Sequence, residues 1–226
     1  MNPNPPMRLA VLASGRGSNL RALIEARQGG ELAAEVVGVF SDKPDSDAIA
    51  LARRQGIECF AVRPGDFASR EAFDERLFSA VAAVQPDLIV CAGYMRLISE
   101  AAVRRFQGRM INIHPSLLPK YPGLDTHARA LAAGDQNHGA SVHVVIPALD
   151  SGAVLAQARI AVRADDTPEA LARRVLEREH RLLVATVALI ASGRLRLAAD
   201  SAALDDVLLA QPLQLGDDDH LFVEAF

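Results

Sequence analysis

Aromatic residues and cysteines are scarce in this sequence, which has no tryptophan, 4% aromatic residues and two cysteines among 226 residues. A core with so few aromatic rings must be built from Ala, Val, Leu and Ile, and the 50% hydrophobic content supplies them. Cys59 and Cys91 are too few for a disulfide framework or a cysteine-based metal site. Both lie in apolar, strand-like runs, where we expect them to be small buried side chains.

An excess of positive charge and long apolar runs are also lacking. The net charge of −4 argues against a general nucleic-acid-binding protein, because neutralising phosphates calls for a basic surface. No apolar run approaches the length of a membrane span, and residues 9–13 are too few for the hydrophobic part of a secretion signal. We therefore expect a soluble cytoplasmic protein whose partners are small molecules rather than nucleic acids or membranes. The sequence does not distinguish a monomer from a homodimer.

The sequence does contain a regular alternation of short β-branched runs and helical patterns over its first half. The patterns predict strands at residues 8–14, 34–41, 57–62, 87–93 and 110–114, and helices at residues 18–27, 47–55, 69–85 and 100–106. This alternation is typical of a doubly wound α/β protein with an open, mostly parallel sheet. We expect one domain that spans residues 1–226.

The later part of the chain follows a different pattern. Two predicted strands, residues 140–146 and 154–162, are close enough in sequence to form an antiparallel hairpin that extends the sheet. A long helix is predicted from about residue 166 to 192, because Asp166, Thr167 and Pro168 offer an N-cap and a proline at the first helical position. The acidic residues 200–226 are typical of a surface strand or tail.

A glycine-rich turn, Ser14-Gly15-Arg16-Gly17-Ser18-Asn19, joins the first predicted strand to the first helix. Glycines at such a turn let backbone amides approach an anion closely. The turn is neither a Walker A loop nor a full dinucleotide fingerprint, because no Gly-Lys-Ser/Thr follows and Leu20 occupies the third glycine position. Phosphate binding and a plain turn with Ser18 as the helix N-cap both stay open, and the broken fingerprint disfavours a ribose-binding role for Asp42.

The strongest chemical signal is Asn112-Ile113-His114, which precedes a loop stiffened by three prolines. Asn112 and His114 are two residues apart on a predicted strand, so their side chains share one face. They lie at the C-terminal end of the strand, where open α/β sheets bind ligands. A carboxamide donor beside an imidazole suits stabilisation of an oxyanion and movement of a proton, and we predict that both residues are functional.

An acidic residue near this pair would complete such a site. Asp150 lies in Leu149-Asp150-Ser151-Gly152 between the two later strands, where an ordinary acidic turn is the alternative. A carboxylate close to His114 would favour the imidazolium and raise the histidine pKa. The other histidines lack metal-ligand spacing, so we expect no metal.

Taken together, these motifs resemble the folate-dependent glycinamide ribonucleotide transformylases (phosphoribosylglycinamide formyltransferases) of purine biosynthesis. The resemblance extends from Arg8 to about Leu197 and rests on SGRGSNL, SREAFD, DLIVCAGYMRLIS, NIHPSLLPKYPG, HGASVHVV and LDSGAVLAQ, in this order. The Asn-x-His…Leu-Leu-Pro core is common to related formyl transferases and hydrolases, whereas PSLLPKYPG is particular to the glycinamide branch. The resemblance implies a Rossmann-like formyltransferase fold with a C-terminal antiparallel extension and long helix. It also implies formyl transfer from the co-substrate 10-formyltetrahydrofolate to 5-phosphoribosylglycinamide.

The resemblance further implies roles for individual residues. It puts Asn112, His114 and Asp150 at the catalytic positions, with no metal. The glycinamide ribonucleotide would contact Gly17, Ser18, Asn19 and Glu179, and also Arg174, which would compensate for Leu176 where relatives often carry a polar or basic residue. The folate would contact Arg70, Met95, Arg96, Leu97, Ile98, Asn112, Ile146, Pro147, Ala148, Leu149 and Asp150. Of these, Arg70 and Arg96 would face its glutamate tail.

Three other functions share part of this pattern. A 10-formyltetrahydrofolate hydrolase would use the same catalytic residues with water as the acceptor, but that family usually carries an N-terminal regulatory domain, and here the first strand begins near Arg8. An initiator-tRNA formyltransferase needs a C-terminal tRNA-binding domain. A non-catalytic nucleotide-binding module is the third alternative, and the intact set of Asn112, His114 and Asp150 weighs against it.

Overall fold

The computed structural model of the protein describes residues 5–224. Its helices are α1 (Ser18–Gln28), α2 (Asp47–Arg54), α3 (Arg70–Ala83), α4 (Glu100–Arg105), α5 (Thr126–Ala132) and α6 (Pro168–Ala191). Its strands are β1 (Met7–Leu12), β2 (Ala34–Ser41), β3 (Cys59–Ala61), β4 (Leu88–Cys91), β5 (Met110–His114), β6 (Asn137–Val144), β7 (Val154–Ala161), β8 (Leu195–Leu197), β9 (Ala202–Leu204), β10 (Val207–Leu208), β11 (Leu213–Leu215) and β12 (Leu221–Phe222). The strands and helices predicted up to residue 192 are all present, with ends shifted by a few residues, and α5 is an additional helix.

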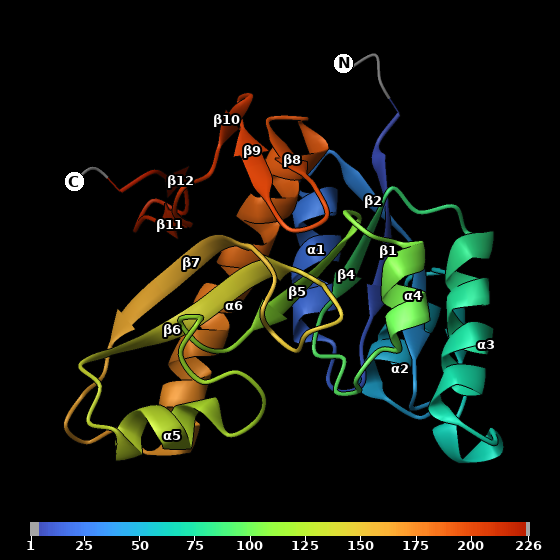
Figure 1. Cartoon of the computed structure of the whole chain (residues 1–226), viewed down its shortest axis with the longest axis horizontal. Coiled ribbons are helices and arrows are strands. Elements are labelled where there is room, and N and C mark those ends of the chain that lie inside the picture. The colour runs from blue at the N-terminus through green and yellow to red at the C-terminus, as the bar shows by residue number, and fades with distance from the viewer. Residues whose placement is uncertain (1–4, 225–226) are drawn as a thin grey trace.

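The main sheet of the described residues has nine strands in the order β12-β11-β7-β6-β5-β4-β1-β2-β3 (Figure 1). The strands β3, β2, β1, β4 and β5 are all parallel, as the helices between them require. β6 is antiparallel to β5, and β7 is antiparallel to β6, so the predicted hairpin does extend the sheet. These findings confirm a doubly wound, mostly parallel α/β fold with an antiparallel extension.

Alternating side chains of the central strands build the two halves of the core. On β1, Leu9 and Val11 face the layer that contains α1, α2 and α6, whereas Ala10 and Leu12 face α3 and α4. All four side chains are completely buried, as expected of a parallel strand covered on both faces. Helices therefore cover both faces of the sheet, and the strand ends are left to carry the functional residues.

The starts of two helices differ in how they are capped. Thr167 caps α6, because its Oγ1 accepts a hydrogen bond from the Ala170 amide at 3.2 Å, and Pro168 follows as predicted. Gly17 precedes α1 with a φ of 71°, and no side chain caps that helix. Ser18 is the first helical residue and not the N-cap, so the interpretation of Ser18 as a cap is wrong. The first amides of α1 are therefore without a side-chain cap.

The C-terminal segment also forms strands. β8, β9 and β10 make a separate three-stranded antiparallel sheet, and β11 pairs in parallel with β7. Leu213 of β11 is completely buried, which anchors this segment to the main sheet.

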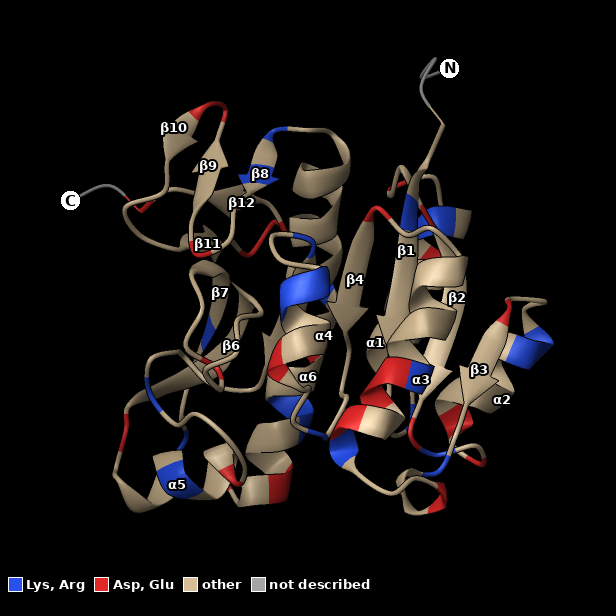
Figure 2. Ribbon diagram, turned by 45° about the vertical axis from the view of Figure 1, so that its right-hand side comes forward, with Lys and Arg blue, Asp and Glu red and all other residues tan. Residues whose placement is uncertain are grey.

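Charged residues of both signs are interspersed along the helices (Figure 2). None of the helices in residues 5–224 has the combination of length and hydropathy that crossing a membrane requires.

Candidate active site

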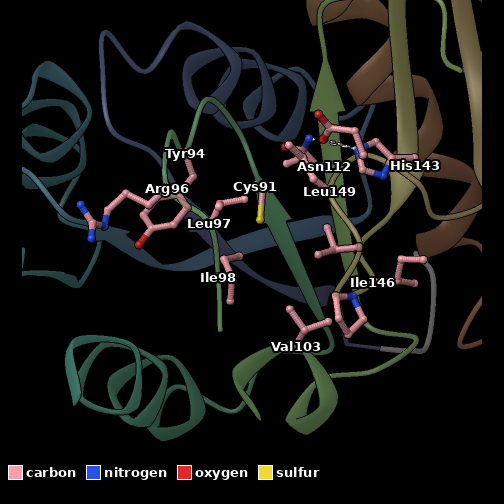
Figure 3. Close-up of a pocket in the computed structure, with 13 residues that line it drawn as sticks. Cys91, Tyr94, Arg96, Leu97, Ile98, Val103, Asn112, His143, Ile146 and Leu149 are labelled. Carbon is pink, nitrogen blue, oxygen red and sulfur yellow. Dashed lines mark hydrogen bonds and ion pairs between the residues drawn. The ribbon is translucent and has the colours of Figure 1, made fainter. Parts of the chain in front are cut away.

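The two polar residues of β5 lie on the face of the sheet that α3 and α4 cover. Ile111 and Ile113 belong to the other half of the core, so Asn112 and His114 share the opposite face, as strand alternation predicts. The strand register places Cys91 of β4 and His143 of β6 on either side of Asn112. These three neighbouring strands form the floor of a pocket (Figure 3).

His114 is a buried imidazole that is held from one side. Its Nε2 lies 2.9 Å from the Tyr121 carbonyl oxygen, and because a carbonyl can only accept, Nε2 carries the proton of the neutral ring. The loop that supplies this carbonyl is braced by Ser116, whose Oγ donates to the Lys120 carbonyl oxygen at 2.6 Å. Nδ1 faces Asp150, whose Oδ2 is 3.5 Å away. Nδ1 is therefore the nitrogen that can take up a proton.

Asp150 reaches this position through a constrained turn. Its backbone adopts a left-handed conformation with a φ of 47°, and its Oδ2 accepts a hydrogen bond from the Gly123 amide at 2.9 Å. Gly152 is required two residues later, because a Cβ there would collide with the Val144 carbonyl oxygen of β6. The LDSG segment is thus shaped to bring the carboxylate to His114, a contact that the sequence alone does not reveal.

His143 is a second histidine of the group, which the sequence reasoning missed. Its Nδ1 donates to the Val144 carbonyl oxygen at 2.9 Å, so the neutral ring accepts through Nε2. Asn112 Nδ2 donates to that Nε2 at 3.1 Å, which fixes the orientation of the carboxamide. The same Nε2 is 3.5 Å from Asp150 Oδ1. The signal that could have identified His143 is the presence of a histidine within the apolar run of a predicted strand.

Burial and charge act in opposite directions on the pKa values of this group. Burial dominates at His114 and lowers its pKa, although the Tyr121 carbonyl and the Asp150 carboxylate both act to raise it. At Asp150, burial acts to raise the pKa, but His143, the Gly123 amide and the charge of His114 together lower it below the ordinary value.

The influence of Asp150 on His114 therefore has the direction expected from the sequence. The net pKa of His114 is nevertheless lowered, because burying the ring outweighs the carboxylate. At neutral pH the free protein holds a neutral His114 beside an ionised Asp150.

A cleft with an empty volume of about 530 Å³, partly open to solvent, runs beside this group (Figure 3). Most of its walls are apolar, with contributions from Cys91, Val103 and Val145. It is also lined by most of the residues predicted to contact folate, namely Arg96, Leu97, Ile98, Asn112, Ile146, Pro147, Leu149 and Asp150. An apolar cleft with polar groups at one end suits a ligand that carries flat rings.

Three of the predicted folate contacts do not line the cleft. Met95 and Ala148 are exposed next to it, and Arg70 lies at the start of α3 with its guanidinium 3.4 Å from Glu71. Arg70 and Arg96 nonetheless both act to lower the pKa of the buried Asp74.

The glycine-rich turn meets the long helix α6, as the proposed nucleotide contacts require. Asn19 Nδ2 donates to Glu179 Oε2 at 3.2 Å, across 160 residues of sequence. Both side chains are buried, and burial raises the pKa of Glu179, against the effect of Asn19. Asn19 Oδ1 is buried without a hydrogen-bond partner in the described residues. Polar groups thus converge next to Gly17 and Ser18 at the uncapped start of a helix, an arrangement that suits an anionic ligand.

Arg174 is not brought to this turn. Its guanidinium lies 2.6 Å from Asp166 Oδ2 and 2.6 Å from the Ala161 carbonyl oxygen, so its donors are engaged at the end of β7. No hydrogen bond or ion pair within the described ranges joins it to the glycine-rich turn, and compensation for Leu176 stays a prediction.

The sequence of this chain matches that of a known protein family. Residues 7–187 match the formyl transferase family, and that stretch contains every candidate residue named above. The chain belongs to the formyl transferase family.

Named relatives of this formyl transferase are similar along most of its length. The phosphoribosylglycinamide formyltransferase of Escherichia coli (strain K12) is 43% identical over 199 residues, which cover 88% of this chain and 94% of the relative. The solved phosphoribosylglycinamide formyltransferase from Coxiella burnetii is 44% identical with a TM-score of 0.86, covering 91% of this chain and 96% of that one. A formyltetrahydrofolate deformylase from Pseudomonas syringae pv. tomato str. DC3000 has a TM-score of 0.80 at 24% identity, covering 88% and 66%. That likeness shows the fold alone.

Within residues 5–224, no group of three or more His, Cys, Asp or Glu side chains is arranged to hold a metal ion.

A buried histidine pair makes the stability of this formyl transferase sensitive to acid. His138 is 1% exposed, and its Nε2 lies 3.1 Å from His127 Nδ1. Burial, with a smaller contribution from His127, lowers the pKa of His138 from 6.5 to about 4. As the pH falls below about 6.5, the unfolded chain binds a proton at this residue before the folded protein does. Stability that is present at pH 7 is therefore lost between about pH 6.5 and pH 4.

We expect His138 alone to lower the free energy of unfolding by about 2 kcal/mol between pH 7 and pH 5. Urea unfolding at the two pH values measures this loss, and the His138→Gln variant should lose about 2 kcal/mol less than the native protein. The lowered pKa values of His114, His127 and His180 add to the loss in both proteins. Equal losses in the two proteins would show that His138 is not responsible.

Proposed function

We propose that this protein transfers the formyl group of 10-formyltetrahydrofolate to the amine of 5-phosphoribosylglycinamide, giving formylglycinamide ribonucleotide and tetrahydrofolate in purine biosynthesis. The observation that carries the proposal is the convergence of Asn112, His114 and Asp150 at one end of an apolar cleft. The relatives named phosphoribosylglycinamide formyltransferase, in Escherichia coli and Coxiella burnetii, support this choice of substrates.

The side chains account for each step of the transfer. The neutral amine attacks the formyl carbon, a carbon–nitrogen bond forms, and the carbonyl oxygen becomes an oxyanion. Asn112 has a second Nδ2 hydrogen, beyond the one given to His143, with which it stabilises this oxyanion. His114 is neutral beforehand, so its Nδ1 takes the proton released by the amine, and Asp150 stabilises the resulting imidazolium. The bond to the folate nitrogen then breaks, and the proton moves to that nitrogen.

The acceptor site supports a nucleotide rather than water as the second substrate. The start of α1 has no side-chain cap, which leaves its amides for the phosphate. The buried pair of Asn19 and Glu179 lies beside it, and Asn19 Oδ1 has no hydrogen-bond partner among residues 5–224. A formyl-folate hydrolase has no use for such a site, because its acceptor is water.

The proposal is tested by following a ¹³C-labelled formyl group from 10-formyltetrahydrofolate into product. We expect the label in an amide of the glycinamide nucleotide, detected by NMR. Label that appears only as free formate would identify a hydrolase instead.

Arg70→Ala is expected to weaken folate binding by about 1 kcal/mol. A desolvated, charge-assisted contact to the glutamate tail contributes about 1.5–3 kcal/mol, but the Arg70 side chain is 46% exposed, and solvent screens its charge. Turnover at saturating folate should change little. Michaelis constants for both substrates measure the effect, with Arg63→Ala, another exposed arginine, as the matched control. Loss of turnover with unchanged folate affinity would show that Arg70 acts elsewhere.

We also propose that this enzyme is a single cytoplasmic domain, a monomer or homodimer, that acts without nucleic acid or membrane. The pairing of β11 with β7, which continues the main sheet into the C-terminal segment, supports a single domain. Sedimentation of the purified protein measures the oligomeric state, and a nucleic-acid complex in that experiment would contradict the proposal.

A further inference from the structure

Asp74 is a buried carboxylate that the mechanism above does not use. It lies on α3, is 1% exposed, and belongs to the layer that contains Phe73 and Leu77. Burial raises its pKa, against the hydrogen bond and the positive charges around it. A carboxylate in an apolar layer is costly unless it makes hydrogen bonds, so its presence there calls for an explanation.

One oxygen of Asp74 holds the end of the loop that forms a wall of the cleft. Oδ2 accepts a hydrogen bond from the backbone amide of Ser99 at 2.6 Å. Ser99 is buried and is the N-cap residue of α4, directly after Ile98. Near the other end of the loop, Ser14 Oγ accepts from the Met95 amide at 3.1 Å. Residues 95–98 therefore run between two anchors, one in the turn that follows β1 and one on α3.

Between these anchors only part of the loop is packed, because Ile98 contacts the core while two other side chains face solvent. Met95 is 65% exposed and Leu97 is 55% exposed. A segment with few buried apolar contacts samples other conformations easily unless hydrogen bonds hold it. The shape of this cleft wall therefore depends on the two anchors.

Asp74 also acts on the two arginines that the folate tail is expected to meet. The charges of Arg70 and Arg96 both act to lower the pKa of Asp74. Arg96 lies against α3, where its guanidinium carbon is 5.2 Å from the centre of the ring of Phe73, the residue next to Asp74. Arg96 Nε is buried with no hydrogen-bond partner in the described part of the chain. Figure 3 shows the Arg96 side chain extending away from Asn112 and His143.

We propose that Asp74 is a positioning residue for the folate substrate, holding residues 95–98 as the cleft wall and orienting Arg96 toward the glutamate tail. The proposal rests on the proposed function and deepens its folate side. Asp74 does not line the cleft, so it acts through Ser99 and Arg96 rather than by touching the substrate.

The test compares Asp74→Ala and Asp74→Asn with the native enzyme. Asp74→Ala removes both the hydrogen bond and the charge, so the Michaelis constant for 10-formyltetrahydrofolate should rise roughly tenfold. Turnover at saturation and the Michaelis constant for the nucleotide should stay within about twofold. The matched control is Glu75→Ala, the next residue on the same helix, whose side chain is 74% exposed and which should change neither constant.

Asp74→Asn separates the two parts of the role. Its amide oxygen can still accept from Ser99, but the charge that orients Arg96 is gone. With 10-formyltetrahydropteroate, which lacks the glutamate tail, Asp74→Asn should match the native enzyme while Asp74→Ala stays impaired. With the full folate, Asp74→Asn should keep a roughly threefold rise in its Michaelis constant.

Equal rises in the Michaelis constants for both substrates, or a fall in turnover alone, would overturn the positioning role. So would an Asp74→Asn variant as impaired as Asp74→Ala with the tail-less substrate. The proposed function fails separately, if the native enzyme transfers no formyl group. In that case calorimetric binding of 10-formyltetrahydrofolate to the native protein and to Asp74→Asn still decides the role of Asp74, with weaker binding expected and equal binding contradicting it.

Discussion

Asp150→Asn is expected to lower turnover by about 10²–10⁴-fold, equivalent to about 3–5 kcal/mol in the barrier. The amide keeps the shape of the side chain and can still accept from Gly123, so the turn should persist. What is lost is the negative charge 3.5 Å from Nδ1 of His114, which stabilises the imidazolium as the proton arrives. This charge acts mainly on the transition state, so equilibrium binding of both substrates should change far less.

The pH profile gives Asp150→Asn a second readout. Asp150 holds the pKa of His114 above the value that burial alone would set, so removing its charge lowers that pKa further. The acid limb of the turnover profile should therefore move to lower pH. Asp87→Asn, next to the opposite end of β4, is the matched control and should leave turnover unchanged. Near-normal turnover of Asp150→Asn would remove the carboxylate from the mechanism and make LDSG an ordinary acidic turn.

Gly17→Val is expected to raise the Michaelis constant for the nucleotide roughly 100-fold and to lower the free energy of unfolding by about 2–4 kcal/mol. A φ of 71° is strained for a β-branched residue, and the added Cβ would lie 2.9 Å from Ala48 Cα of α2. The turn must therefore shift and take the start of α1 with it, away from the phosphate. The Michaelis constant for folate should change little.

Gly30→Val separates the effect on binding from the effect on stability. Gly30 also has a positive φ, 79°, but a Cβ there meets nothing within 4 Å, and it lies beyond the far end of α1. This variant should show part of the stability loss and no change in either Michaelis constant. Kinetics at a temperature where both variants are folded decide the question, and an unchanged nucleotide constant for Gly17→Val would leave only a plain turn.

Features set by local sequence could be predicted reliably. Alternation on β5 put Asn112 and His114 on one face, and the cap and proline at Thr167 and Pro168 set the start of α6. The failure at Ser18 has a physical reason, because Gly17 takes the left-handed conformation and occupies the cap position itself. Local sequence propensities do not predict this left-handed conformation, which depends on the close approach of α2.

Contacts between segments that are distant in sequence could not be predicted from local sequence patterns. The 3.5 Å approach of Asp150 to His114 depends on a hairpin register and on Gly152, and the place of His143 opposite Asn112 depends on the pairing of β5 with β6. The sign of the pKa shift at His114 depends on how deeply the fold buries the ring. The spacing of residues along the sequence carries no information on this depth. The engagement of Arg174 with Asp166 is likewise a property of the folded chain.

The acceptor dependence of folate release tests formyl transfer most directly. The purified protein is mixed with 10-formyltetrahydrofolate, with and without 5-phosphoribosylglycinamide, and the release of tetrahydrofolate is followed. We predict release that requires the amine and matches it mole for mole. Equally fast release without the amine would contradict transfer and identify a hydrolase, and no release under either condition would contradict catalysis altogether.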